Sequence, residues 1–323
     1  MGEFLDLLKS LVGKRFPFKL VYSNEYWMFD TGKHVFPLQK YRLVYENLLA
    51  MGARREDFLR PRPASDEDLL LVHTARYLKH LKTGSLSPAE IQALELRFSP
   101  DLLRFALLSV GGTILAAREA LKSGMALHIG GGFHHAFRDH GEGFCVLNDV
   151  AVAVEKMIQE KNGRRVMIVD CDLHQGNGTA AIFGGRDDVF TFSIHQMDIY
   201  PAEKPPGTLD VLLWAGDGDA KYLDGLRAHI PRIYQECRPD LVLYLAGADP
   251  YERDQLGGLR VTKAGLKERD RLVIEGARRL HIPVAVVLAG GYASEIEDTV
   301  GIHVETIRIA QRVQRIFPGN PLP

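Results

Sequence analysis

The sequence of 323 residues predicts an α/β fold with a parallel sheet at its centre. Short apolar runs alternate along the chain with segments of helical periodicity, as they do in βαβ units. The apolar runs are continuous and do not alternate in polarity, which is typical of parallel strands covered on both faces. No repeat, low-complexity linker or composition break marks a second domain. We therefore expect residues 1–323 to form a single domain.

The expected strands and helices follow one another along the whole chain. Strands are expected where apolar residues run together, at residues 18–22, 125–129, 165–170, 189–194, 240–246 and 282–289. Helices are expected where apolar residues recur at helical spacing, at residues 39–51, 99–123, 148–161, 219–236, 262–280 and 299–316. Residues 1–15 hold an amphipathic stretch without a basic face, so we expect this segment to pack on the domain and not on a membrane surface.

The composition argues against several classes of function. The formal net charge is -1 and no Lys/Arg run is present, so we expect no nucleic-acid partner. No apolar stretch approaches the roughly 18 residues that cross a bilayer, so we expect no membrane span. The cysteines are odd in number and far apart, without a signal-peptide pattern, which favours a reducing cytoplasm over a disulfide framework. They are Cys145, Cys171 and Cys237.

Polar, glycine and ionisable residues gather where the expected strands end. In an open parallel sheet, ligands bind beyond the carboxyl ends of the strands, where loops from several strands meet. The segments that follow the later strands are GGGFHHAF after 129, DCDLHQGNG after 169, HQMDIYP after 194, GADPYERDQLGGL after 246 and GGYASE after 289. We therefore expect these segments to form one functional site at one edge of the sheet.

The first candidate within this site is a metal centre. Asp170, Asp172 and His174 are spaced two apart at the end of an expected strand, so they project from one face. An Asx-rich turn would explain them without a ligand, but burying unpaired carboxylates is costly. Asp249 follows another buried strand and could complete a site with Asp172 and His174 that leaves one position for water. This donor set suits catalytic zinc, and its oxygen-rich composition also suits Fe(II).

The second candidate is a proton-transfer pair. His134 and His135 follow a triple glycine that lacks the spacing of a dinucleotide-binding loop or P-loop. One imidazole could take a proton from an attacking water while the other donates one to a leaving group. Each imidazole needs an acceptor on its other nitrogen, and Asp170 and Asn177 are the candidates. A carboxylate partner would raise the pKa of its imidazole more than an amide would.

Two aromatic residues complete the expected site. Tyr292, in AGGYA, could donate a hydrogen bond to an oxygen that becomes negative, although an aromatic plug in a glycine turn would look the same. Phe144, in GEGFCVLND, could form the wall of a narrow channel, although an aromatic near a strand is often part of the core. A bound water, a proton-transfer pair and an oxyanion donor together indicate hydrolysis of an amide or ester.

A series of motifs recurs in a known order over residues from about 30 to 300. The motifs are GKHVFPLQKYRLV, LLLVHTARYL, GGGFHHAF, GFCVLND, VDCDLHQGNGT, FSIHQ, GADPYERDQLGGL and AGGY. In these motifs the chain resembles the zinc-dependent histone deacetylase and acetylpolyamine amidohydrolase superfamily. The pairing of HQGNG with DQLGGL is most similar to class IV histone deacetylases and their bacterial relatives.

The resemblance implies an arginase/deacetylase fold, with a central parallel sheet of about eight strands flanked by helices. It implies that the histidine pair is the general acid and base and that Tyr292 polarises the acyl carbonyl. It further implies that Asp172, His174 and Asp249 bind zinc.

The resemblance also implies partners for the histidines and walls for a substrate channel. Asp170 would support His134 and Asn177 would support His135, a position at which class I enzymes have Asp. The segment 197–219 differs from the class I channel loop. The implied channel residues are Gly143, Phe144 and Tyr200. A structural potassium ion is implied near the backbone of Asp170, Asp172 and His174, together with Ser193 and Ile194.

The sequence therefore predicts zinc-dependent hydrolysis of the amide bond of acylated lysine side chains in peptides or proteins. One alternative is an amidohydrolase for acetylpolyamines or other small acylated amines. A second is an arginase-like ureohydrolase, which would need ligands for another metal ion that DCDLHQGN does not supply. A third is a catalytically silent acyl-lysine-binding protein, although every catalytic position is filled.

Overall fold

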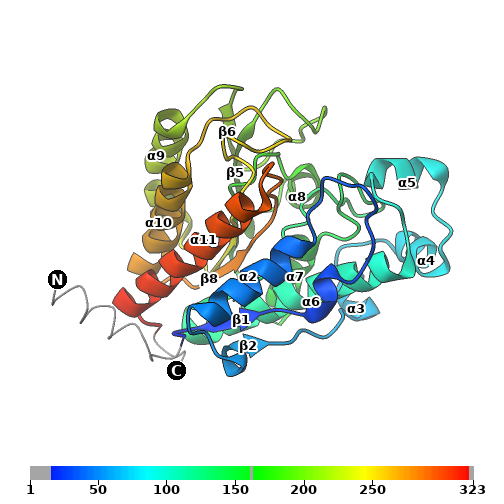
Figure 1. Ribbon diagram of the computed structural model, residues 1–323, viewed down its shortest axis with the longest axis horizontal. Helices are drawn as coiled ribbons and strands as arrows, with labels where there is room; N and C mark the ends of the chain where they lie inside the picture. The colour runs from blue at the N-terminus through cyan, green and yellow to red at the C-terminus, as the bar shows by residue number, and fades with distance from the viewer. Residues whose placement is uncertain (1–15, 161–162, 320–323) are drawn as a thin grey trace.

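The computed structural model describes residues 16–160 and 163–319 (Figure 1). Its centre is an eight-stranded sheet with the strand order β2-β1-β3-β8-β7-β4-β5-β6. Neighbouring strands are parallel throughout, as the continuous apolar runs predict. The strands are β1 (Lys19–Val21), β2 (Phe58–Leu59), β3 (Met125–His128), β4 (Val166–Asp170), β5 (Val189–Gln196), β6 (Leu209–Leu213), β7 (Leu241–Leu245) and β8 (Val284–Val287).

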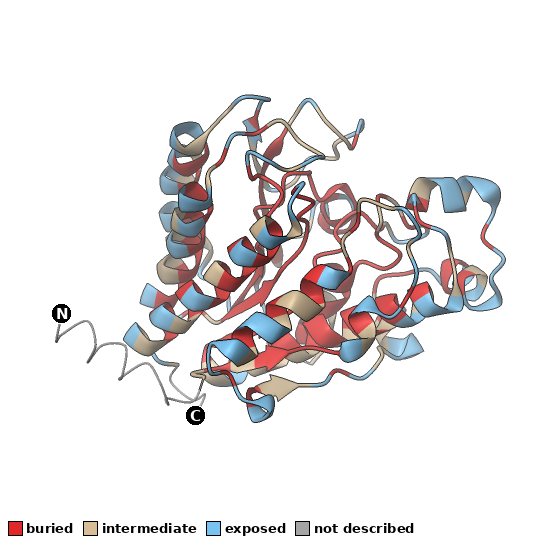
Figure 2. Cartoon of the chain, in the orientation of Figure 1, coloured by how far each residue is buried: buried red, intermediate tan, exposed pale blue. Residues whose placement is uncertain are grey.

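Helices cover the sheet in two layers. Helices α9, α10, α11 and α2 pack one against the next in one layer, and α6 packs on α7 and across β1, β3 and β8 in another. Figure 2 shows that the central strands are buried while the outward faces of the helices are exposed. The helices are α2 (Gln39–Ala50), α3 (Asp66–Leu69), α4 (Ala75–Thr83), α5 (Pro88–Leu94), α6 (Pro100–Ser123), α7 (Asp149–Gln159), α8 (Asn177–Phe183), α9 (Asp219–Cys237), α10 (Lys263–Arg279) and α11 (Ile296–Ile316), with the 3-10 helices η1 (Asn24–Trp27) and η2 (Arg55–Asp57).

The expected strands and helices are present, with ends that shift by a few residues. The sequence patterns missed two strands and several short helices. Strand β6 was missed because it lies at the edge of the sheet, where its residues are mostly half-buried and no continuous apolar run is needed. Strand β2 is too short to carry a pattern. The other missed elements are α3, α4, α5, α8 and the 3-10 helices η1 and η2. The predicted amphipathic segment 1–15 lies outside the described residues.

Helix α6 corrects the expectation that no stretch approaches the length of a membrane span. The helix has 24 residues, and by length and composition alone it could cross a bilayer. However, most of it is buried, because it packs on β3 on one side and on α7 on another. Within the described residues it is the one helix of this kind, and its packing is that of a core helix.

The loops after β3 and β8 approach each other too closely for most side chains. Gly132 has a φ of +90°, and a Cβ on it would lie 2.6 Å from the Cα of Ala289. The backbone N–H groups of Leu288 and Ala289 donate to the carbonyls of Gly130 and Gly131. These contacts hold the loop that carries the histidine pair against the loop that carries Tyr292.

A buried carboxylate also fixes the glycine loop, which is the triple glycine at residues 130–132. Asp149, which is 0% exposed, begins α7. Its Oδ1 accepts hydrogen bonds from the backbone N–H groups of Phe133 at 2.7 Å and Gly132 at 3.2 Å. Its Oδ2 accepts from the hydroxyl of Thr113. Because the carboxylate has these donors around it, it can stay buried and define the path of the loop.

Candidate active site

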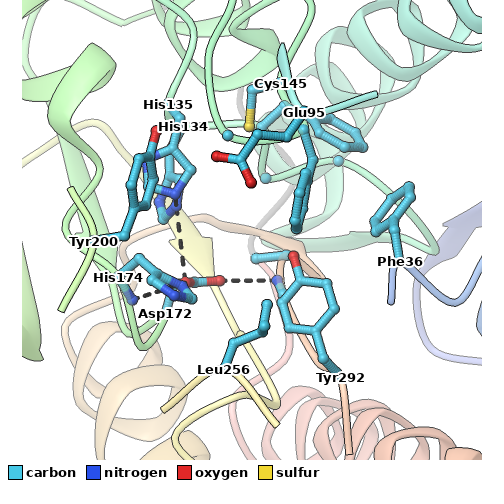
Figure 3. A pocket seen from close by; sticks show the side chains of 17 residues that line it. Phe36, Glu95, His134, His135, Cys145, Asp172, His174, Tyr200, Leu256 and Tyr292 are labelled. Carbon is cyan, nitrogen blue, oxygen red and sulfur yellow. Dashed lines mark hydrogen bonds and ion pairs between the residues drawn. The ribbon is translucent and has the colours of Figure 1, made fainter. Parts of the chain in front are cut away.

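A cavity of about 190 Å³ lies at the carboxyl edge of the sheet, where the sequence predicts a site (Figure 3). The loops after β3, β4 and β8 contribute side chains to it, together with the segments around residues 36, 95, 143, 200 and 256. Asp170, Asn177 and Asp249 are not among the residues that line the cavity. The sequence-predicted residues that line the cavity are His134, His135, Gly143, Phe144, Asp172, His174, Tyr200 and Tyr292.

Asp172, His174 and Asp249 form a buried cluster at the base of the site. One ligand atom from each lies within 4.8 Å of the other two. The Nδ1 atom of His174 is 3.3 Å from Asp172 Oδ1 and 3.6 Å from Asp249 Oδ2. Asp249 Oδ2 is buried and has no hydrogen-bond partner in the described part of the chain. A buried carboxylate oxygen without a donor fits a cation, so these residues fit a divalent metal such as zinc.

Backbone donors hold the two carboxylates of this cluster in place. The N–H of Gly290 donates to Asp172 Oδ2 at 2.8 Å, and the N–H of Leu173 donates to Asp249 Oδ1 at 3.0 Å. Burial and the charge of Asp172 raise the pKa of Asp249 to about 7. Burial alone would lower the pKa of His174, but the two carboxylates outweigh burial and raise it to about 10. The cluster therefore has a strong affinity for positive charge.

The histidines of the predicted pair face each other and have different partners. His134 Nε2 and His135 Nε2 are 3.1 Å apart. His134 Nδ1 lies 2.7 Å from a carboxylate oxygen of Asp170, and His135 Nδ1 lies 2.7 Å from the amide oxygen of Asn177. The structure thus brings each histidine to the partner expected from the sequence.

The unlike partners give the two imidazoles different proton affinities. Burial lowers the pKa of His134, but the Asp170 and Asp172 carboxylates more than compensate and raise it to about 9. Burial and the positive charges of His134 and His174 hold the pKa of His135 well below its usual range. At neutral pH, one ring of the pair therefore carries a proton to donate and the other has a free lone pair.

Tyr292 lies across the cavity from the histidine pair (Figure 3). Its backbone is held on both sides, because its N–H donates to Asp254 at 2.7 Å and its carbonyl accepts from the Gln255 side chain at 2.8 Å. Burial, with the nearby charges of Asp172 and Asp249, raises the pKa of the phenol well above its usual value. The hydroxyl therefore stays protonated and can donate a hydrogen bond.

Residues 34–307, which include all of these side chains, match the family model of the histone deacetylase domain. The chain belongs to the histone deacetylase family. It is 39% identical to an uncharacterized protein of Picosynechococcus sp. over 92% of this chain and 99% of that protein. It is 32% identical to histone deacetylase 2 of Arabidopsis thaliana over 89% of this chain and 78% of that protein. It is 34% identical to the acetoin utilization protein AcuC of Bacillus subtilis over 78% of this chain and 71% of that protein.

Solved structures agree with this histone deacetylase fold. A crystal structure of an HDAC homolog complexed with SAHA has a TM-score of 0.80 and 24% identity, covering 93% of this chain and 84% of that one. The crystal structure of the HDA15 HD domain has a TM-score of 0.74 and 23% identity, covering 91% of this chain and 88% of that one. The family and the fold together make the chain a hydrolase of the deacetylase type.

Aromatic side chains form the walls of the deacetylase cavity. The ring of Phe144 lies 5.9 Å from that of Tyr292 and 6.1 Å from that of Phe36. On the opposite side, the ring of Tyr200 lies 5.0 Å from that of His135. A Cβ on Gly143 would lie 2.7 Å from the Tyr200 hydroxyl, so glycine lets the two walls approach. Phe144 and Tyr200 line the cavity, as the resemblance implies.

Several residues of the site were not expected from the sequence. Lys40 is 0% exposed, its Nζ donates to the carbonyl of Ala289 at 2.8 Å, and burial lowers its pKa to about 8. The sequence held a signal for Lys40. It lies four residues before the apolar Val44 in an expected helix, so the two residues share one face of that helix. Glu95 lines the cavity. Glu142 bonds to Asn177. For these two acidic residues the sequence held no local signal.

Two of the five residues that the resemblance places near a potassium ion line a second, smaller cavity. Asp170 and Ser193 line it together with Gln175 and Asp210. The side-chain oxygen of Gln175 is buried and without a partner among the described residues. Asp172, His174 and Ile194 do not line this cavity.

Proposed function

We propose that the chain is a zinc-dependent deacylase that hydrolyses the amide bond of acylated lysine side chains in peptides or proteins. One observation carries the proposal. The unpartnered Asp249 oxygen and its two neighbouring ligands lie beside two histidines with opposite proton affinities, at the base of a cavity with aromatic walls. This arrangement provides a site for a metal, a base, an acid and an oxyanion donor within one pocket.

Asp172, His174 and Asp249 would hold the zinc ion. When bound, zinc activates a water molecule and polarises the acyl carbonyl. Fe(II) is the alternative metal that suits two carboxylates and one imidazole. The pair Asp172 and Asp249 would neutralise the charge of the ion, and the backbone donors from Gly290 and Leu173 would keep both carboxylates oriented.

The histidine pair would move the protons of the reaction. His135 keeps its Nε2 lone pair at neutral pH, so it can accept a proton from the attacking water. His134, held as an imidazolium by Asp170, can donate a proton to the amine as the C–N bond breaks. Each positioned transfer is typically worth about 10²- to 10⁴-fold in rate.

Tyr292 would stabilise the charge that develops on the acyl oxygen. Its phenol remains protonated and lies across the cavity from the pair, so it can donate to the oxygen as it becomes negative. Phe144 and Tyr200 would exclude water and hold the aliphatic part of a lysine side chain between two aromatic walls. A linear chain with an amide at its end fits this cavity.

An acetylpolyamine or another small acylated amine is a second candidate substrate. Glu95 supports it, because this acidic residue lines the cavity and is exposed to solvent. A carboxylate there would attract a second ammonium group of a polyamine.

We propose three further properties of the protein. A structural potassium ion would bind at the smaller cavity. The chain would belong to the class IV branch, because Asn177 stands where class I enzymes have Asp. Its location would be the cytoplasm, which the free cysteines favour.

Release of free lysine amine from acyl-lysine peptides tests the proposal. The panel would contain acetyl, lactyl and myristoyl peptides and N-acetylputrescine. We expect turnover of at least one peptide, loss of turnover after chelation, and recovery with zinc. His135→Ala should lower kcat by about 10²-fold or more. Turnover of N-acetylputrescine alone would replace the peptide substrate with the second candidate. No turnover of any compound would refute the deacylase function.

A further inference from the structure

We propose that Glu142 is a positioning residue that fixes the tautomer of His135 by orienting the amide of Asn177. This inference rests on the proposed deacylase function and names a residue to which that function assigns no role. Glu142 does not line the cavity and lies directly before Gly143, so it touches neither the expected metal site nor the acyl group. It acts through a chain of hydrogen bonds.

The chain has two links. The Nδ2 atom of Asn177 donates to Glu142 Oε1 at 2.8 Å. On the other side of the same amide, Asn177 Oδ1 lies 2.7 Å from His135 Nδ1. Because Oδ1 can only accept, the His135 Nδ1 atom must carry the proton. The Nε2 atom, which lies 3.1 Å from His134 Nε2, then keeps a lone pair, and this is the form that a general base requires.

Glu142 decides this orientation because an amide can be turned by half a rotation. In the reversed orientation, Asn177 Oδ1 would face Glu142 Oε1, and two acceptors would meet without a hydrogen between them. The Asn177 Nδ2 group would then face His135 Nδ1 and favour the tautomer with the proton on Nε2. A carboxylate behind Asn177 excludes this state, whereas a group without an acceptor would allow it.

Glu142 is itself held in place by two other side chains. The hydroxyl of Tyr200 donates to the same Oε1 atom that accepts from Asn177. The His140 ring lies 3.7 Å from the other oxygen. The Glu142 side chain is 23% exposed, so it remains in contact with water while its bonded oxygen faces inward. Asn177, in contrast, is only 2% exposed, so its amide depends on protein partners.

Two substitutions separate orientation from charge. Glu142→Gln can keep an oxygen toward Asn177 and Tyr200 while it removes the charge. Glu142→Leu removes the acceptor at similar size. We expect Glu142→Leu to lower kcat by about tenfold or more, as the loss of an outer-sphere partner does, and Glu142→Gln to stay within about threefold of wild type. Asp139→Asn is the matched control, because Asp139 also contacts His140 but has no contact with Asn177.

A change at Asn177 tests the link directly. Aspartate has no donor end, so either of its oxygens can accept from His135 and no second residue is needed to orient it. Asn177→Asp alone should lower kcat, because the new carboxylate would face Glu142. Adding Glu142→Leu should then raise kcat, although the same change lowers kcat in the Asn177 background. This reversal of sign would not arise if Glu142 only stabilised the fold.

The tautomer can be read without any turnover. In the zinc-loaded full chain, long-range ¹H–¹⁵N spectra distinguish a His135 protonated on Nδ1 from one protonated on Nε2, with the signals assigned by their loss in His135→Ala. We expect Nδ1 protonation in wild type and Glu142→Gln, and a mixture in Glu142→Leu. A unique Nδ1 tautomer in Glu142→Leu, or an equal loss of kcat in both Glu142 variants, would overturn the proposal. If wild type turns over no substrate, the deacylase function fails, and the spectra still decide the role of Glu142.

Discussion

Two buried carboxylates of the fold have opposite surroundings. Asp149, below the glycine loop, is 0% exposed and accepts hydrogen bonds from Thr113, Gly132 and Phe133. Asp249, at the end of β7, is 1% exposed, and its Oδ2 has no donor among the described residues. Burial raises the pKa of both groups. The same residue type, equally buried, is thus fully satisfied in one place and half satisfied in the other.

The difference indicates what each carboxylate is for. A buried oxygen without a donor costs free energy, so a folded protein retains one where a ligand supplies the missing interaction. Asp249 lies beside a second carboxylate, Asp172, which increases the cost. Asp149 supplies interactions that the backbone of the glycine loop needs. We infer that Asp249 binds the metal and destabilises the metal-free fold, and that Asp149 stabilises the fold.

The largest expected effect is the loss of activity in Asp249→Asn. Removal of a ligand from the expected zinc site should lower kcat/KM by about 10³-fold or more. The metal-free protein should become no less stable, and up to about 2 kcal/mol more stable, because repulsion from Asp172 is removed. Kinetics with zinc and urea unfolding without it check the two parts. A loss of metal-free stability would mean that Asp249 is a structural carboxylate like Asp149.

Asp149→Asn should reduce stability more, and activity less, than Asp249→Asn does. An asparagine would direct an amide donor toward Thr113 or toward a backbone N–H of the loop, so at least one buried donor loses its acceptor. We expect a loss of about 2–4 kcal/mol in the free energy of unfolding. Activity should fall less than in Asp249→Asn, by about 10- to 100-fold, because the loop carrying the histidines shifts. The urea midpoint and kcat together test this. Unchanged stability would contradict the assigned role.

Zinc should protect the protein only where the ligand set is complete. At a free concentration of about 100 times the Kd, zinc should add about 2.7 kcal/mol of stability to wild type. The gain should persist in Asp149→Asn and vanish in Asp249→Asn. Thermal unfolding at fixed zinc concentration, with magnesium as the control ion, measures it. An equal gain in both variants would place the metal elsewhere.

The sheet and its edge were predictable because both depend on local patterns. The run from Val166 to Val169 is apolar without a break, and it is followed at once by Asp170, which predicts both a buried strand and its polar end. Strand β6 gave no such signal, because only Leu213 among its residues is buried. A strand at a sheet edge needs fewer apolar residues, so its sequence resembles that of a loop.

The histidine partners were predictable from spacing, but the residues behind them were not. Asp170 and Asn177 stand in the same short motif as Asp172 and His174, two of the three proposed metal ligands. Glu142 meets Asn177 across 35 positions in the sequence, and Lys40 meets Ala289 across 249. No periodicity relates such pairs, since the loops that join them are fixed by the tertiary fold. Sequence patterns therefore locate the reacting groups better than the groups that orient them.

The smallest expected effect concerns the pH dependence of the Asp149 region. His128 contacts the Tyr26 hydroxyl at 2.7 Å and the Thr113 hydroxyl at 3.0 Å, and burial lowers its pKa to about 3. A depressed histidine pKa means that the unfolded chain binds a proton first as pH falls. Stability from this group is therefore present above about pH 6.5 and is lost as pH falls toward 3.

Between pH 6.5 and 5, this one group should cost wild type about 1.5 kcal/mol, and His128→Gln should not show this part of the loss. Asp149 titrates in both proteins, so its contribution cancels in the difference between them. Urea unfolding of both proteins across this pH range gives the difference directly. Parallel pH profiles would show that His128 becomes protonated within the fold. In that case the network around Asp149 would accommodate a charge, and the contrast with the half-satisfied carboxylate at Asp249 would be weaker than the static contacts indicate.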